Sequence, residues 1–217
     1  MKSIRIVFVA LVAVFAFSAV AASSALASPE WYAKKSGTWA KITTPVAFEA
    51  ESKYEFTDTK LAIWKVIGKE ATIACTGTTK GVVGAGAAAK LNELRSSSCA
   101  CSIPGSECTF TRDEVRNLPW LTELYKEGTE IRSKFVSNGG KLPVWIFAYE
   151  FSGQGFGDEC LVNTSTHMAN TATGVEAKFD AKSSKTKCSE GGAEAGEWKG
   201  FIKMKPTEKG VEAIKVE

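Results

Sequence analysis

Six cysteines are the residues best suited to chemistry in this chain, and three of them fall in the stretch CACSIPGSEC at 99–108. They are Cys75, Cys99, Cys101, Cys108, Cys160 and Cys188. Zinc sites usually combine C-x₂₋₄-C pairs with each other or with histidine, whereas the spacing here is C-x-C-x₆-C. A redox-active C-x-x-C motif does not occur in the sequence. The spacing therefore favours structural disulfides over a metal centre or a redox site.

Other residue types that catalyse reactions or bind metals give weaker patterns. The single histidine, His167, lies in the polar segment NTSTHMAN, and neither G-x-S-x-G nor H-E-x-x-H occurs. Calcium needs clustered carboxylates, and the best pair is Asp158 with Glu159 in SGQGFGDEC. The glycine-rich stretch 80–89 lacks the Lys-Ser/Thr that ends a phosphate-binding loop. We therefore expect no catalytic residue, no metal and no cofactor.

Six tryptophans offer a different kind of site, because flat indole rings can form a sugar-binding surface. Trp64 and Trp145 lie inside apolar runs and are expected in the core. The candidates for ligand-surface aromatics are Trp31, Trp39, Trp120 and Trp198, which lie in mixed surroundings. Their partner would be a cell-wall or extracellular glycan. The competing interpretation places most tryptophans in the core, and the sequence leaves this choice open.

The N-terminus has the three parts of a secretory signal peptide. Lys2 and Arg5 precede a run at 6–22 that contains no charge, and Ala25-Leu26-Ala27 supplies small residues for cleavage. The alternative is an uncleaved membrane anchor, which needs a run of about 20 apolar residues. We expect residues 1–27 to be removed and 28–217 to form a single secreted domain without a membrane span. Export would place the protein in an oxidising compartment, and disulfides persist in such compartments.

The charge balance gives little reason to expect a polyanionic partner. Residues 28–217 carry a net charge of +1, because the first 27 residues hold two of the 27 basic residues and no acidic ones. The lysines are spaced out along the chain and form no long basic block. Nucleic acid and anionic membrane surfaces are therefore not indicated as partners.

Turn signals allow a provisional pairing of the cysteines. If Pro104-Gly105 form the loop of a two-residue hairpin, Cys101 and Cys108 face each other across the strands at disulfide distance. Cys99 is then free to meet Cys75, and Cys160 and Cys188 remain for each other. Pro-Gly favours type I or II turns over the primed turns of tight hairpins, and a longer loop would break this register.

Period-two alternation and short apolar runs predict mostly strands after residue 27. In the segment 46–54, Val46, Phe48, Ala50 and Tyr54 share one face. Strands are expected at 46–54, 61–67, 71–75, 107–112, 142–151, 174–180, 197–203 and 210–216, with 80–89 as a turn or bulged strand. About ten short strands between turn signals indicate an all-β fold, an antiparallel β-sandwich or a barrel-like domain. Helix is expected to be scarce, with single turns at 113–116 and 92–95.

Several short motifs are shared with a known group of proteins. They are Trp31-Tyr32, Cys75 with Gly81, the C-x₆-C of Cys101 and Cys108, Leu118-Pro119-Trp120 with Glu123-Leu124, Cys160, Gly174-Val175, Lys178-Phe179-Asp180, Cys188 with Gly191, and Trp198-Lys199-Gly200. On these motifs the chain resembles uncharacterised exported, β-rich, disulfide-containing proteins of actinobacteria. The resemblance implies no activity. In that group a cysteine usually ends the strand around Trp145; here Tyr149 and Phe151 occupy that region and Cys99 is additional, so no pairing is taken from it.

The functional expectation is an exported extracellular or cell-envelope protein with a non-enzymatic structural or binding role. The alternative is a carbohydrate-binding or adhesion module that uses surface tryptophans. The third hypothesis is an exported hydrolase with two carboxylates flanking a cleft. Aligned exposed aromatic rings would favour the second hypothesis, and a cleft with paired carboxylates would favour the third.

Overall fold

All the secondary structure in the described residues is β-strand, so the expected all-β class is confirmed. The computed structural model describes residues 28–58, 70–180, 185–188 and 192–217. The strands are β1 (Trp31–Lys35), β2 (Thr38–Lys41), β3 (Val46–Asp58), β4 (Ala71–Val83), β5 (Ala88–Ser102), β6 (Cys108–Arg116), β7 (Trp120–Glu127), β8 (Glu130–Val136), β9 (Val144–Phe151), β10 (Gln154–Leu161), β11 (Ser165–Asn170), β12 (Val175–Phe179), β13 (Lys185–Cys188), β14 (Gly192–Pro206) and β15 (Ala213–Val216). The expected signal peptide and the expected strand at 61–67, with Trp64, lie outside the described residues.

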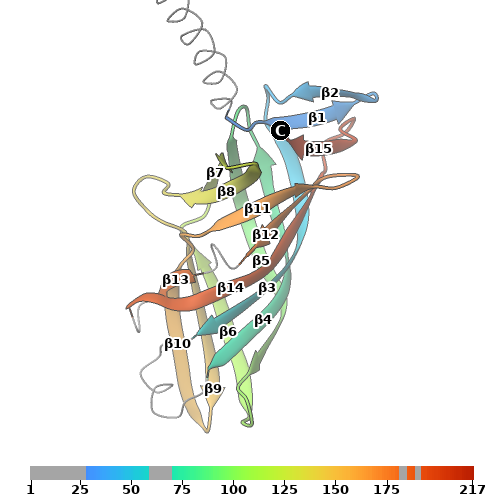
Figure 1. Ribbon diagram of the computed structural model, residues 1–217. Coiled ribbons are helices and arrows are strands. Elements are labelled where there is room, and N and C mark those ends of the chain that lie inside the picture. The colour runs from blue at the N-terminus through green and yellow to red at the C-terminus, as the bar shows by residue number, and fades with distance from the viewer. Residues whose placement is uncertain (1–27, 59–69, 181–184, 189–191) are drawn as a thin grey trace, which may run out of the picture.

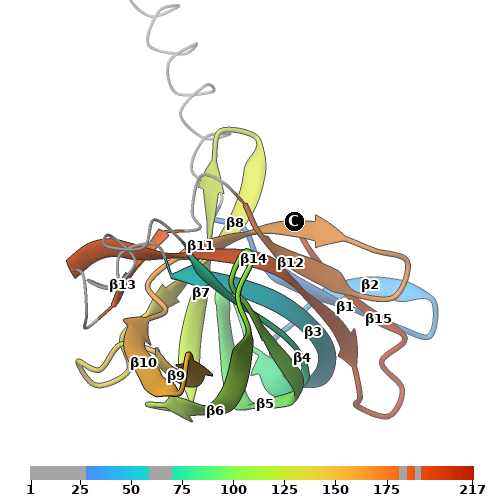
Figure 2. The same cartoon turned by 90° about the horizontal axis from the view of Figure 1, so that it is seen from below.

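Eight strands form a closed antiparallel ring. Their order is β12-β11-β8-β7-β5-β4-β3-β14, and β14 pairs with β12 again, which closes the wall. Closure removes the exposed edges that an open sheet would present over these segments. Figure 1 shows the ring from the side, and Figure 2 shows the same strands from below.

Four further strands continue the wall beyond the ring, toward the bottom of Figure 1. These strands, β13, β10, β9 and β6, are called the lower wall. The four long strands β3, β4, β5 and β14, of 13 to 15 residues, run through both parts. Along β14, residues 200–204 pair with β12 and residues 192–197 pair with β13. The long strands therefore join the ring and the lower wall into one body.

Alternation of burial directs side chains into this body. Every second residue of β4 is buried over its whole length, as expected for a strand with one face on a core. Gly77 and Gly81 take inward positions where β4 and β5 shift register. A Cβ on either glycine would collide with a carbonyl oxygen of β5, at Arg95 or Lys90. Glycine thus allows the close approach of backbones that a strongly coiled wall requires.

The structure corrects three details of the sequence-based expectations. The segments 113–116 and 92–95, expected as helical turns, lie in β6 and β5. The described residues form fifteen strands where about ten were expected for the whole chain, and four of the fifteen are long. The reason is that pairing with strands from distant parts of the chain holds polar segments in extended conformation, although these segments have little strand preference by themselves.

A small sheet, β15-β1-β2, covers one end of the ring and places Glu30, near the start of the described residues, beside the C-terminal residue Glu217. Glu30 and Glu217 exchange backbone hydrogen bonds of 2.7 and 3.1 Å. Asn170 of β11 hydrogen-bonds both backbone groups of Val216 through its side chain, at 2.8 and 2.9 Å. These contacts attach the small sheet to the ring.

Candidate functional site

All six cysteines form disulfides, and the three pairs are those expected from turn signals. Cys75 and Cys99 are direct register partners on β4 and β5, with Cα atoms 4.1 Å apart. The Cα atoms of Cys160 and Cys188, register partners on β10 and β13, are 4.0 Å apart, and those of Cys101 and Cys108 are 5.4 Å apart. The cysteines therefore brace the wall.

The turn Pro104-Gly105 joins β5 to β6 but leaves the two strands without a ladder. Ile103 and Ser106 form one isolated bridge, and Gly105 has φ +67°, as the third residue of a type II turn requires. Type I and II turns splay the strands of a hairpin. Among the described residues, no ladder hydrogen bonds join β5 and β6, although the strands remain neighbours. We call this part of the wall the β5–β6 seam.

The surface proposed for the tryptophans is contradicted by their burial. Of the four candidates, Trp31, Trp120 and Trp198 are at most 4% exposed, and Trp39 alone is on the surface, at 37%. The three buried tryptophans are buried because strand alternation turns each of them inward. Their mixed sequence surroundings gave no sign of this. Trp39 lies on β2, with the Lys215 ammonium 4.7 Å from its ring centre. One exposed ring does not form an aligned aromatic surface.

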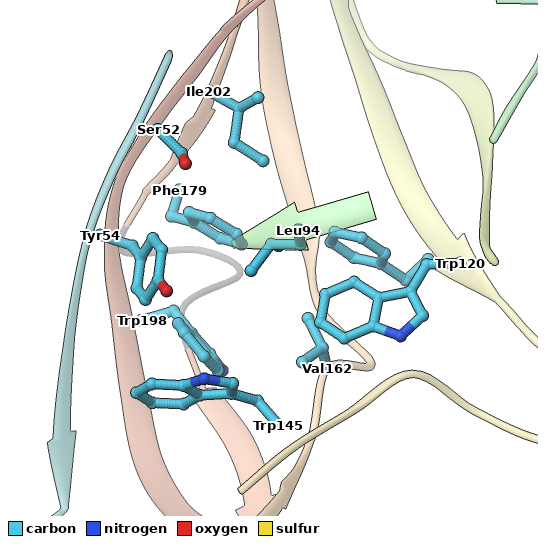
Figure 3. Close-up of a pocket in the computed structure, with 10 residues that line it drawn as sticks. Ser52, Tyr54, Leu94, Trp120, Trp145, Val162, Phe179, Trp198 and Ile202 are labelled. Atoms are coloured by element: carbon cyan, nitrogen blue, oxygen red, sulfur yellow. The ribbon is translucent and has the colours of Figure 1, made fainter. Parts of the chain in front are cut away.

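Three buried tryptophans, Trp120, Trp145 and Trp198, instead line a cavity inside the molecule, shown in Figure 3. Its volume is about 30 Å³. The lining comes from both the ring and the lower wall, through Ser52, Tyr54, Leu94, Trp120, Phe135, Trp145, Val162, Phe179, Trp198 and Ile202. The centroid of the Trp198 ring lies 5.0–6.1 Å from the centroids of four other aromatic rings. We call this space the aromatic cavity.

Two polar groups of the aromatic cavity have no hydrogen-bond partner within the described part of the chain. The Ser52 hydroxyl and the Trp198 indole N–H are both buried and unpaired. Figure 3 shows the Ser52 hydroxyl directed into the cavity, and the Trp198 ring beside Trp145. Buried polar groups in folded proteins are nearly always paired, so such exceptions mark places where a further partner fits. The sequence pattern could have located Ser52, since it shares the inward parity of Ala50 and Tyr54.

A polar network closes the β5–β6 seam next to the cavity. The Ser96 hydroxyl donates to Oδ2 of Asp113, and the Tyr54 hydroxyl bonds to Ser96 Oγ. Because the Ser96 proton is directed to Asp113, Tyr54 is the donor in its bond to Ser96. The Trp145 indole N–H also donates to Asp113 Oδ2, at 3.2 Å. Four strands, β3, β5, β6 and β9, thus meet through side chains where the backbone ladder is missing.

This environment raises the pKa of Tyr54 from its ordinary value of 10.0 to about 12. Burial is the largest cause, the negative charge of Asp113 adds to it, and the bond with Ser96 opposes it. When a phenol stays protonated in the folded state, the free energy of unfolding falls once the pH is high enough for the same phenol to ionise in the unfolded state. Its contribution is therefore complete below pH 10 and is lost as the pH rises toward 12.

We expect the free energy of unfolding to fall between pH 10 and pH 12 by up to about 1.4 kcal/mol per pH unit because of Tyr54. Tyr54→Phe should remove this part of the slope and leave the slope below pH 10 unchanged. Urea unfolding at half-unit pH steps measures both proteins. Parallel curves for the two proteins above pH 10 would contradict the assignment to Tyr54.

The residues considered for catalysis or metal binding are not brought together. His167 lies half-buried on β11, where its register partners are Arg132 and Lys178. Asp158 is buried and Glu159 is exposed, because they alternate along β10. The two side chains point to opposite faces of the strand, so the structure does not bring together the pair that the sequence offered as its best calcium candidate. Asp158 does lie close to Cys160 and Cys188, but their sulfurs are joined in a disulfide.

A buried arginine forms the densest ionic cluster of the described residues. The Arg132 side chain on β8 is 1% exposed, and its guanidinium binds the Asp180 carboxylate through two bonds of 2.8 and 2.9 Å. Glu130 lies 3.3 Å and Glu127 3.5 Å from it. The bonds with Asp180 are the main cause of the raised pKa of Arg132. This cluster fastens the end of β12 to β8.

The fold and these contacts define an all-β protein stabilised by disulfides. No protein-family model, curated protein or solved structure matches the chain. Among the described residues, no helix has the length and apolar character needed to cross a membrane. The resemblance to exported actinobacterial proteins stays a prediction.

Proposed function

We propose that this protein is exported and works outside the cytoplasm in a non-enzymatic role, as a binding or structural protein. The observation that carries the proposal is the pairing of all six cysteines in disulfides that brace neighbouring strands. Such bonds persist in oxidising compartments and are rare in the reducing cytosol. The signal peptide expected from the sequence agrees with this proposal.

The binding role is supported by the interior of the molecule. The aromatic cavity combines an apolar lining with two buried, unpartnered polar groups at Ser52 and Trp198. Ligand sites in proteins share this composition, a mostly apolar wall with a few placed polar groups. His167 lies on β11 outside this cavity lining, and Asp158 and Glu159 point to opposite faces, so these groups give no support to hydrolytic chemistry.

We expect the chain expressed with residues 1–27 in a bacterial host to be recovered outside the cytoplasm, beginning at Ser28. Intact mass should equal residues 28–217 less six hydrogens, and a thiol reagent should label no cysteine. Ala27→Leu removes the small residue at the cleavage bond and should leave the precursor uncleaved, whereas Ala21→Leu, outside the cleavage motif, should be processed normally. A cytoplasmic full-length chain with free thiols would refute export.

A further inference from the structure

The interior of the ring holds two neighbouring cavities of about 30 Å³ each. The first is the aromatic cavity, and the second, called the upper cavity, lies toward the small sheet at Trp31. Phe135 and Ile202 line both cavities and therefore separate them. An eight-stranded barrel is just wide enough either to be filled by side chains or to hold one small ligand. The unfilled space lies where such a ligand would bind.

Unpartnered polar groups accompany this space. Trp31 lines the upper cavity, and Ser52 and Trp198 line the aromatic cavity. The indole N–H groups of the two tryptophans and the Ser52 hydroxyl have no hydrogen-bond partner among the described residues. All three side chains are at least nine-tenths buried. Leaving a buried donor unpaired costs about 1–3 kcal/mol. A ligand acceptor that pairs with one of these donors supplies the hydrogen bond that the described residues do not provide.

The lining also defines the chemical class of the ligand. No charged side chain of the described residues lines either cavity, and an unpaired charge is expensive to bury, so the proposed ligand is uncharged. Aromatic rings from Tyr54, Trp120, Trp145 and Trp198 favour a planar, apolar body. An indole N–H only donates, so the ligand carries a hydrogen-bond acceptor for Trp198.

We propose that the interior of the ring binds one small, uncharged, largely apolar molecule that carries a hydrogen-bond acceptor, with Trp198 Nε1 as the donor and Ser52 Oγ as the second polar contact. This proposal specifies the binding role proposed above and rests on it, but it does not depend on export. Each cavity alone has about the volume of one water molecule in the liquid. Displacement of Phe135 joins them and makes room for the ligand.

The β5–β6 seam is the access route to this site. The ladder that joins β5 to β7 ends at Leu91 of β5. Leu94, three residues further along β5, lines the aromatic cavity. Past this point the seam is held by the Ser96–Asp113 bond and, at its far end, by the Cys101–Cys108 disulfide. Side-chain bonds can open without breaking a backbone ladder, so the seam separates more easily than the rest of the wall.

The experiment uses three fluorinated probes with the mature, oxidised protein and ¹⁹F NMR titration. 4-Fluoroacetophenone is uncharged and has a carbonyl acceptor, 1-ethyl-4-fluorobenzene has nearly the same shape without the acceptor, and 4-fluorobenzoate is charged. We expect one saturable site for the ketone, binding about tenfold weaker for the ethyl compound through loss of one hydrogen bond, and no saturable binding of the benzoate.

Two variants assign the contacts, and a third serves as a matched control. Trp198→Phe keeps an aromatic ring but removes the N–H, and should weaken binding of the ketone about tenfold without changing binding of the ethyl compound. Ser52→Ala should also weaken ketone binding selectively. Thr79→Val removes another fully buried, unpartnered hydroxyl, on β4, that does not line either cavity, and should leave all affinities unchanged. Thermal unfolding of each variant confirms that it is folded.

The kinetics test the access route separately. Ser96→Ala removes the bond that bridges the seam, and should raise the association and dissociation rate constants of the ketone together, by about tenfold. Unchanged rates would place the route elsewhere and overturn this part of the proposal.

Three results would overturn the ligand site itself. These are the absence of saturable binding by any probe, which would mean that the cavities hold only water; equal binding of the benzoate; and an equal effect of Thr79→Val and Trp198→Phe. The thiol count and N-terminal residue are determined on the same protein sample. An exported, oxidised protein that binds no probe would therefore refute this inference and leave the proposed export intact.

Discussion

Reduction of the three disulfides is expected to lower the melting temperature by roughly 20–35 °C. The loops closed by Cys75–Cys99 and Cys160–Cys188 span 24 and 28 residues, and the loop of Cys101–Cys108 spans 7. Restriction of the unfolded chain by loops of these lengths corresponds to about 3.5 kcal/mol for each long loop and about 2.4 kcal/mol for the short one. Since domains have only about 5–15 kcal/mol of net stability, the reduced chain should be marginal.

Near-ultraviolet circular dichroism of the buried aromatic rings, with and without a phosphine reductant, measures this change. Paired alanine variants separate the bonds: loss of Cys160–Cys188 should lower the melting temperature more than loss of Cys101–Cys108, because the closed loop is longer. A reduced protein that melts with the oxidised one, or the opposite order of the two variants, would show that the disulfides do not stabilise the fold in this way.

Asp180→Asn should destabilise the protein by about 2–3 kcal/mol, because it leaves the buried Arg132 guanidinium without its bidentate partner. Glu127 and Glu130 remain near the guanidinium and keep the loss below that of an isolated buried charge. Glu127→Gln is the matched control: it removes one carboxylate charge from the same guanidinium, but that carboxylate is 53% exposed, so the cost should stay below about 1 kcal/mol.

Urea unfolding with an unchanged m-value gives both differences in unfolding free energy. Arg132→Lys should be destabilising as well, since an ammonium group cannot form the two parallel bonds with Asp180. Equal losses for Asp180→Asn and Glu127→Gln would mean that burial of Arg132 does not determine the energetics of this cluster.

Local pattern was sufficient for several features of the fold. Alternation in 46–54 located an inward face that the structure confirms at Val46, Phe48, Ala50 and Tyr54. The Pro104-Gly105 signal placed a turn between Cys101 and Cys108, and its turn type also accounts for the missing β5–β6 ladder. These features could be predicted because strand parity and turn chemistry depend on residues close together in the sequence.

The aromatic cavity could not be predicted in the same way. Trp120 and Trp198 lie in mixed sequence surroundings, and they meet only because β7 and β14 belong to one closed wall. Ser52 has the parity of an inward residue, but its isolation from partners depends on which side chains arrive from other strands. The polar network likewise joins distant residues: Tyr54 and Ser96 are 42 positions apart, and Ser96 and Asp113 are 17 positions apart.

The sequence by itself determined the all-β class, the use of cysteines as disulfides and the turn at Pro104-Gly105, since each follows from short-range alternation, spacing or turn residues. Only the tertiary structure decided that β12 pairs with β14 to close a ring, that Trp120, Trp145 and Trp198 line the aromatic cavity, and that Arg132 is buried against Asp180. The physical reason is that burial and hydrogen-bond satisfaction depend on the strands that become neighbours. In this fold those neighbours come from distant parts of the chain.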